Sequence, residues 1–237
     1  MQYSIADFYS KTHCPYPVFL PLWRKAVFVD WHGVLCKDVF WFSILRNANH
    51  PYHARLREAT EDLFTRRSYL IEDWMRGRLA AEDMVTLLDV TLDRRCRDDF
   101  LVRRLKDDCR RMQVYPELLQ ELQLVRRISF VILATDNMDC FIERLRYGKD
   151  LDRSFDAVLW SARLGVLKTD NVSDFFGSWL SAHNLSFTDS ILLDDNPEIC
   201  AAFRLLGGTA IVVKSAQQAV RELRCWCLRN DSVGYDA

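Results

Sequence analysis

Two apolar runs of the chain end directly in acidic residues. Residues 26–29 lead into Asp30, and residues 190–193 lead into the pair Asp194 and Asp195. If both runs are neighbouring parallel strands, their carboxyl ends meet at one edge of a sheet, where open α/β sheets bind ligands. Clustered carboxylates repel one another, so they indicate a hard cation or a proton-transfer reaction. The chain therefore predicts an acidic site at a sheet edge.

Two further polar segments follow apolar runs between these acids. Thr135 and Asp136 come after the apolar residues 128–133, and Lys168 ends a loop that begins at residue 162. Both segments follow strand-like runs, and the carboxyl ends of parallel strands meet at one edge of a sheet. These residues are therefore expected to join the acids at the same edge.

The elements that would position these residues alternate between strand and helix. Buried strands are predicted at residues 26–29, 128–133, 155–160, 190–195 and 209–213. Helices are predicted at 139–146, 172–184, 197–206 and 216–228. This alternation is typical of an α/β fold with a Rossmann-like, mostly parallel sheet.

A helical block of about 90 residues interrupts this alternation between the first strand and the second. It runs from Asp38 to about Arg127, with breaks expected at Pro51 and Gly77. We therefore predict a core of residues 1–36 and 128–237, with a helical cap, residues 37–127, inserted after the first strand. Residues 1–25 contain three prolines and several aromatic residues and are expected to pack along the core.

Composition bounds the remaining possibilities. The 237 residues are 49% apolar with a net charge of −1, so neither nucleic acid nor a charged membrane surface is an expected partner. No apolar run approaches the roughly 20 residues that span a bilayer, and no secretory signal is apparent. The eight cysteines are scattered without CxxC spacing, which favours reduced thiols and a cytoplasmic location.

The order of the polar segments resembles the haloacid dehalogenase-like superfamily of hydrolases. In that superfamily a nucleophilic Asp, a hydroxyl residue, a Lys and an acidic pair follow one another, as Asp30, Thr135, Lys168 and Asp194 with Asp195 do here. The resemblance covers about residues 24–214, and the inserted cap matches the superfamily's helical-cap type. Residues 74–78 and 114–117 also look like the branch related to the N-terminal phosphatase domain of epoxide hydrolases.

The resemblance implies a function and a site. It implies Mg²⁺-dependent hydrolysis of a small phosphomonoester through an aspartyl-phosphate on Asp30. By the same resemblance, Asp30, the backbone carbonyl of His32, Asp195 and, as an additional ligand, Asp194 would hold the metal. Thr135 and Lys168 would bind the phosphoryl oxygens. The substrate-binding residues would be Gly33, Thr135, Asp136 and Lys168.

His32 is the departure from the superfamily's pattern, because its phosphatases carry an acid at this position. An imidazole that titrates near pH 6.5 can protonate a leaving group and then activate water. A bulky ring beside the metal can instead impair turnover, which leaves a ligand- or protein-binding module as the alternative. Phosphonate hydrolases and dehalogenases of this superfamily also lack the second acid. The dehalogenases work without metal and do not usually carry an ending like residues 194–196. A phosphonate hydrolase needs a cap lysine, and the cap offers Lys37 and Lys106 in no recognisable context.

Several of these residues also have structural interpretations. The acids at 194–195 could cap the helix that starts at Pro197, and Thr135 could cap the helix that follows it. Trp31 is expected to pack beneath the sheet edge or against the cap. The segment from His50 to His53 is expected to start a helix rather than to bind metal.

Overall fold

The computed structural model describes residues 25–88, 90 and 99–231. Its centre is a five-stranded sheet in the order β3-β2-β1-β4-β5, with every neighbouring pair parallel. The strands are β1 Ala26–Val29, β2 Phe130–Thr135, β3 Ala157–Trp160, β4 Ser190–Asp194 and β5 Thr209–Val212. The predicted Rossmann-like α/β sheet is confirmed.

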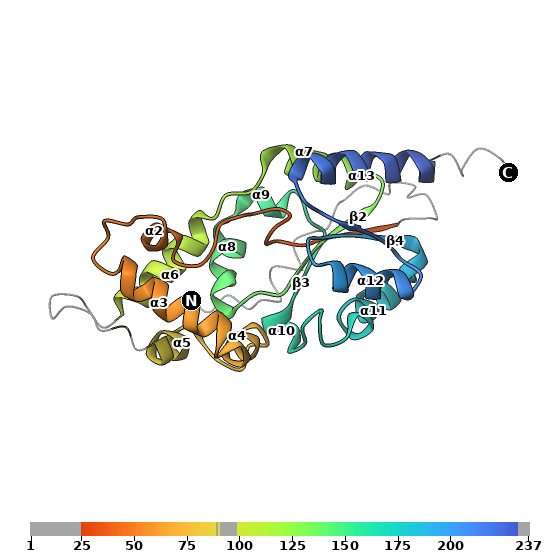
Figure 1. Ribbon diagram of the computed structural model, residues 1–237. Coiled ribbons are helices and arrows are strands. Elements are labelled where there is room, and N and C mark those ends of the chain that lie inside the picture. The colour runs from red at the N-terminus through yellow and green to blue at the C-terminus, as the bar shows by residue number, and fades with distance from the viewer. Residues whose placement is uncertain (1–24, 89, 91–98, 232–237) are drawn as a thin grey trace, which may run out of the picture.

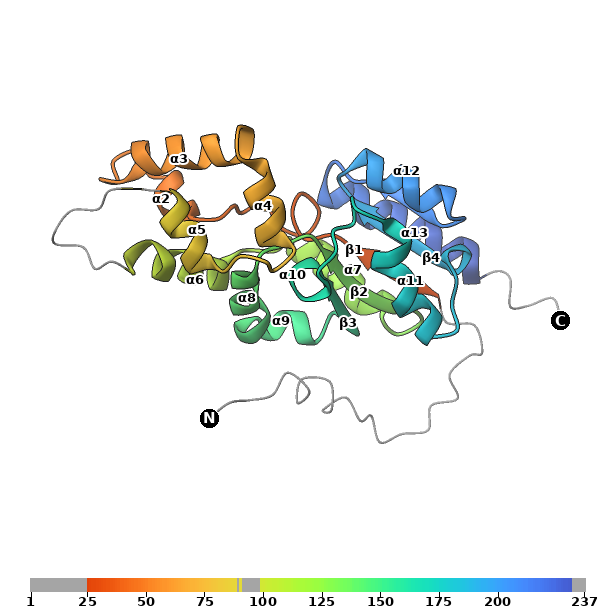
Figure 2. The same ribbon diagram turned by 90° about the horizontal axis from the view of Figure 1, so that it is seen from below.

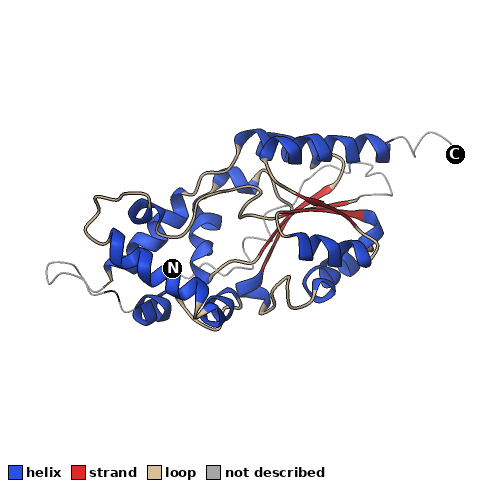
Figure 3. Ribbon diagram, in the orientation of Figure 1, coloured by secondary structure: helices blue, strands red, loops and turns tan. Residues whose placement is uncertain are grey.

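Helices cover both faces of the sheet (Figures 1 and 3). On one face, Val27 and Val29 of β1 share a hydrophobic cluster with α7 Pro116–Val125 and α13 Ala216–Asp231. On the other face, Ala26 and Phe28 pack with residues of α11 Val172–Ala182 and α12 Pro197–Leu205. Because both faces are buried, the central strands are continuous apolar runs rather than alternating ones.

The second strand lies two residues further along the chain than the sequence predicts. Residues 128 and 129 still belong to the turn after α7, because the N–H groups of Ile128 and Ser129 both donate to the carbonyl of Val125. β2 therefore begins at Phe130 and includes Thr135, which is paired with Trp160 of β3. The hydroxyl of Thr135 thus lies at the end of a strand rather than in a turn.

The inserted helices gather past the end of β1 (Figures 1 and 2). They are α2 Phe42–Leu45, α3 His53–Thr65, α4 Ser68–Met75, α5 Ala81–Leu88 and α6 Phe100–Arg111. Both expected breaks occur, since α3 begins two residues after Pro51 and Gly77 follows α4 with φ +70°. Since β1 leads into this group and all strands are parallel, the helices lie at the carboxyl-end side of the sheet.

One helix of the predicted cap range packs on the core instead. α7 lies beside α13 and against β2 (Figure 1), so it belongs to the layer that covers the sheet. By packing, the core therefore resumes at Pro116, earlier than the predicted residue 128. The division into two domains stays a prediction.

Short elements after β2 and β3 join the sheet to the inserted helices. They are the 3₁₀ turn η1 Asp139–Phe141, α8 Ile142–Tyr147, α9 Lys149–Asp152 and α10 Ser161–Leu164; a second 3₁₀ turn, η2 Phe187–Asp189, precedes β4. Asp139 accepts hydrogen bonds from Trp74 Nε1 at 2.6 Å and from the backbone N–H of Ala81 at 3.2 Å. This one carboxylate therefore attaches both α4 and α5 to the core.

The six cysteines within the described residues are free thiols, as predicted. Cys14 and Cys96 lie outside the described residues, and so does the expected packing of residues 1–24. None of the described helices combines the length and the apolar character that a membrane crossing requires.

Candidate active site

The sheet brings the two acidic strand ends together. β1 lies between β2 and β4, with Val29 opposite Leu133 and Leu193. The next residue, Asp30, donates its backbone N–H to the carbonyl of Leu193 at 2.9 Å, and Asp194 ends β4 at the same level. The chain continues in opposite directions from β1 and β4, so this edge is the topological switch point of the sheet.

Lys168 lies between the two carboxylates. Its Nζ donates to Asp30 Oδ1 at 2.8 Å, to Asp194 Oδ2 at 2.6 Å and to the carbonyl of Ala134 at 3.3 Å. All three ammonium hydrogens therefore have acceptors. Only 3% of the Lys168 side chain and 1% of that of Asp194 are exposed. Such a desolvated charge cluster is costly to build and is typical of functional sites.

The charges in this cluster shift one another's proton affinities. Burial raises the pKa of Asp30 to about 8, although Lys168 opposes the rise. Burial lowers the pKa of Lys168, but Asp30 and Asp194 outweigh it, so the net change is upward. A protonated, neutral Asp30 would stabilise the Lys168 cation less than the ionised carboxylate does. We take Lys168 as a cation, since Asp194 is a second carboxylate in contact with it.

Asp195 completes a group of three carboxylates. Oxygens of Asp30, Asp194 and Asp195 lie within 4.8 Å of one another, and Asp195 is the exposed member. Gly33 lies against it, with φ +78°, and a Cβ built on Gly33 would overlap Asp195 Oδ2. Glycine is therefore required here both for its backbone conformation and for the space that the carboxylate occupies.

His32, two residues after Asp30, is exposed. Its backbone forms a bridge with Cys36, which closes the turn after β1. Burial and Asp194 raise the pKa of Asp195, whereas His32 and Lys168 lower it. The net effect is a raised pKa of Asp195, and His32 is one of the two groups that oppose the rise.

Thr135 and Asp136 lie on the β2 side of the site. Thr135 is buried, and its Oγ1 accepts a hydrogen bond from Asn137 Nδ2 at 3.4 Å. The Asp136 carboxylate accepts the backbone N–H of Lys168 at 3.0 and 3.2 Å, so it holds the lysine's main chain. Their expected contacts with a substrate stay predictions.

The helix after β4 is capped by a residue other than the two acids considered for that role. The side chain of Asn196 accepts the N–H groups of Glu198 and Ile199 at 2.8 and 3.3 Å, and Pro197 is the first helical residue. The capping hypothesis for Asp194 and Asp195 is wrong, because an asparagine one residue later already satisfies these donors. Asn directly before Pro is a sequence signal that could have found it.

The structural interpretations of Trp31 and of the segment from His50 to His53 are confirmed, whereas that of Thr135 is not. Trp31 is 1% exposed and packs edge-on against Phe141. His50 Nδ1 accepts the N–H of Tyr52, and α3 begins at His53, so this segment starts a helix. No capping hydrogen bond comes from Thr135, because the 3₁₀ turn that follows starts only after Met138.

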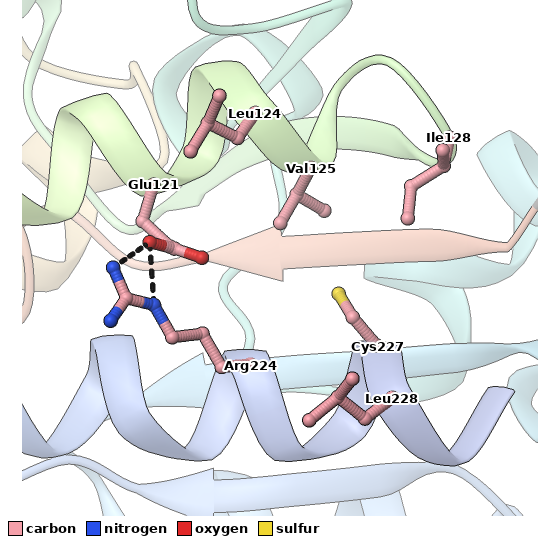
Figure 4. A pocket seen from close by; sticks show the side chains of 7 residues that line it. All are labelled: Glu121, Leu124, Val125, Ile128, Arg224, Cys227 and Leu228. Carbon is pink, nitrogen blue, oxygen red and sulfur yellow. Dashed lines mark hydrogen bonds and ion pairs between the residues drawn. The ribbon is translucent and has the colours of Figure 1, made fainter. Parts of the chain in front are cut away.

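A surface groove lies elsewhere, between α7 and α13 (Figure 4). It is lined by Glu121, Leu124, Val125, Ile128, Arg224, Cys227 and Leu228. Its single ion pair, Glu121 with Arg224, lies at one end of an otherwise apolar lining. The groove contains none of the carboxylates of the site.

The chain resembles known proteins in structure rather than in sequence. No protein-family model matches the chain, and no curated protein matches it by sequence. Solved structures do match. A haloacid dehalogenase-family enzyme from Bacteroides thetaiotaomicron, in complex with magnesium and inorganic phosphate, is 12% identical with a TM-score of 0.57; the match covers 79% of this chain and 93% of that one.

Two further structures show the same likeness. A predicted hydrolase of this type from Porphyromonas gingivalis is 16% identical with a TM-score of 0.58, covering 80% of this chain and 90% of that one. L-2-haloacid dehalogenase from Xanthobacter autotrophicus is 18% identical with a TM-score of 0.55, covering 79% and 76%. The chain therefore has the haloacid dehalogenase-like fold. Its finer resemblance to the epoxide hydrolase branch stays a prediction.

Proposed function

We propose that this protein is a hydrolase that cleaves small phosphomonoesters with Mg²⁺, through an aspartyl-phosphate on Asp30. The observation that carries the proposal is the buried Lys168, which contacts Asp30 and Asp194 at the switch point of the sheet. A fixed cation beside a strand-end carboxylate provides a place for a dianionic group next to a nucleophile. The fold and the magnesium and phosphate of the Bacteroides enzyme support it.

The carboxylate group fits a magnesium ion. Mg²⁺ prefers carboxylate and carbonyl oxygens, and three carboxylates lie within 4.8 Å of one another beside a glycine that leaves them room. Asp30, Asp195 and the backbone carbonyl of His32 would hold the ion, with Asp194 as an additional ligand. When bound, it would reduce the repulsion between the carboxylates and a phosphate.

The chain's own residues would divide the reaction as follows. Asp30 attacks phosphorus as the ionised carboxylate, the form that the contacting Lys168 cation and, when bound, a metal ion favour over the protonated form that burial favours. The alcohol leaves from the opposite side. Thr135 and Lys168 hold the phosphoryl oxygens, for which Lys168 exchanges one of its three present acceptors. The Lys168 cation stabilises the charge that develops on these oxygens. His32, exposed beside Asp195, donates a proton to the leaving alcohol and then accepts one from the water that cleaves the aspartyl-phosphate.

The site also bears on the competing activities. The dehalogenases among the similar structures raise halide release as another reaction of this fold. The acidic pair Asp194 and Asp195 favours a cation-dependent reaction over a metal-free one. Of the two cap lysines considered for a phosphonate hydrolase, Lys106 pairs with Glu82, and Lys37 is exposed, 5.8 Å from the ring centre of Tyr115.

The test is phosphate release from a panel of small phosphomonoesters with Mg²⁺ at pH 5 to 9. We expect turnover in the wild type, none in Asp30→Asn, and unchanged turnover in Asp174→Asn, which alters an exposed acid on α11. A limb of the pH–rate profile that is present in the wild type and absent in His32→Gln would support the acid–base role. Chelation of Mg²⁺ should abolish activity.

Two outcomes would contradict the proposal. Chloride release from 2-chloropropionate without metal would favour a dehalogenase. Binding of Mg²⁺ and inorganic phosphate with no turnover of any compound would favour the binding module, in which His32 blocks the reaction. The cytoplasmic location is part of the same proposal and rests on the free thiols.

A further inference from the structure

The turn after α4 forms two hydrogen bonds to the loop that carries Lys168. Arg76 donates from Nε to Asp170 Oδ2 at 2.9 Å and from Nη2 to Asp170 Oδ1 at 2.5 Å. Its remaining terminal nitrogen, Nη1, donates to Glu72 Oε2 at 3.1 Å. These contacts leave 13% of the Arg76 side chain exposed. The guanidinium is thus held from α4 and directed at a residue 94 positions away in the chain.

Asp170 uses the same carboxylate to shape the loop. Its Oδ2 accepts the backbone N–H of Leu167 at 3.0 Å, while its own N–H donates to the carbonyl of Leu167 at 3.1 Å. These two bonds close a tight turn around Lys168. The backbone of Lys168 is fixed from the other side by Asp136.

The turn after α4 also touches the start of this loop. Gly77, with φ +70°, lies so close to Ala162 that a Cβ on it would overlap the Ala162 carbonyl oxygen. Ala162 belongs to α10, and α4 and α10 lie side by side in Figures 1 and 2. The cap therefore contacts both ends of residues 162–170. Gly77 lies against Ala162, and Arg76 bonds to Asp170.

We propose that Arg76 is a positioning residue, which holds residues 162–170 from the cap so that the Lys168 ammonium stays between Asp30 and Asp194. The catalytic meaning of this contact rests on the proposed function, in which Lys168 acts on the transferring group. Arginine suits the role because its planar fork matches both carboxylate oxygens, which a lysine ammonium does not. Any movement of α4 would be transmitted to the loop through this fork.

An ordinary surface ion pair is the alternative, and such pairs have little effect. The additional bond from Leu167 distinguishes this one, because loss of Arg76 would free a carboxylate on which the loop's own turn depends. The hydrogen bonds from Arg76 also lower the pKa of Asp170, so this carboxylate is charged near neutral pH. The distinction can be measured without any substrate.

The experiment compares Arg76→Met with Arg76→Lys and with the control Arg78→Met. Arg78 is the next arginine along the chain, 63% exposed, and pairs with Asp73. Its charge also acts on Asp170, more weakly than that of Arg76, so it controls for the loss of a nearby positive charge. Hydrogen–deuterium exchange is followed in peptides that cover residues 162–170. We expect faster exchange there in Arg76→Met, an intermediate effect in Arg76→Lys, and wild-type exchange in Arg78→Met. Peptides of β1 and β4 should exchange at the wild-type rate in all three.

Turnover gives the second readout. With a phosphomonoester that the wild type hydrolyses, kcat of Arg76→Met should fall on the order of 10- to 100-fold, with a smaller change in KM, and Arg76→Lys should recover part of it. Wild-type exchange in residues 162–170 of Arg76→Met, or faster exchange with unchanged kcat, would overturn the inference. If the wild type hydrolyses nothing, the proposed function fails, and the exchange comparison still decides whether Arg76 holds the loop.

Discussion

Two aspartates of this protein each contact a cation, yet their pKa values shift in opposite directions. Asp30 contacts Lys168 and has its pKa raised to about 8, because burial outweighs the attraction of the lysine. Asp170 contacts Arg76 and has its pKa lowered, because the hydrogen bonds from the arginine outweigh a small burial effect. The side-chain exposures are 10% for Asp30 and 34% for Asp170.

The two ion pairs differ because burial, rather than residue type, decides how strongly each charge depends on its partner. In the buried cluster each charge depends on the others, since little water is available to replace a lost partner. In the contact between Arg76 and Asp170, water can replace much of the interaction, so the pair adds little stability. It mainly orients the loop of Asp170 and attaches it to the cap. The first region suits a reaction, and the second suits the placement of its lysine.

Removal of the buried cation should affect both activity and stability more than any other change. Lys168→Met should abolish turnover and lower the free energy of unfolding by about 3–5 kcal/mol, because it leaves two buried carboxylates without their partner. Urea unfolding and phosphate release measure the two effects. Lys214→Met, which removes an exposed lysine, should stay within about 0.5 kcal/mol of the wild type. Equal stabilities for the two variants would show that the cluster is solvated.

A second variant tests the attachment of the cap. Asp139→Ala removes the acceptor of the buried Trp74 Nε1 and of the Ala81 N–H. We expect a loss of about 1–3 kcal/mol in the free energy of unfolding, together with faster proteolysis of residues 68–88. Asp152→Ala, at an exposed aspartate, is the control. A stability equal to that of this control would contradict the assigned anchor.

Two glycines with the same backbone conformation test whether Asp195 is a metal ligand. Gly33 and Gly165 have similar backbone angles, φ +78° and +74°, but only Gly33 lies against another group. Alanine at either position should cost about 1–2 kcal/mol for its left-handed conformation. Gly33→Ala should also displace Asp195 and weaken Mg²⁺ binding roughly 10- to 100-fold, measured by titration calorimetry, whereas Gly165→Ala should bind like the wild type. Similar metal affinities would exclude Asp195 as a ligand.

The smallest expected effect concerns pH. Because the pKa of Asp170 is lowered from 3.8, the pair with Arg76 stabilises the fold above about pH 4 and loses this contribution as the pH falls through the lower, folded-state pKa. The stability difference between wild type and Arg76→Met should be about 0.2–1 kcal/mol at pH 7 and smaller at pH 3. Urea unfolding at both pH values measures it, with Arg78→Met alongside. A difference that grows at pH 3 would contradict the assignment.

Much of the fold follows from local patterns. The short apolar runs at residues 26–29 and 190–193 are typical of strands buried on both faces, and their acidic ends had to meet if the strands were parallel neighbours. The cap at Asn196 is a limit of a weaker kind, because Asn directly before Pro does indicate it, but only the backbone shows which of the neighbouring polar residues accepts the N–H groups. The packing of α7 shows another limit, since an amphipathic helix does not specify which partner covers its apolar face.

The sequence alone determined which groups were available at the sheet edge: Asp30, Thr135, Lys168 and the acids at 194–195. Residue type and strand period are local properties of the chain, and they suffice for this much. Only the tertiary structure decided that Lys168 lies between Asp30 and Asp194, that Gly33 makes room for Asp195, and that Arg76 reaches Asp170. Each of these contacts joins distant segments, and the charge states within them depend on which other segments exclude water.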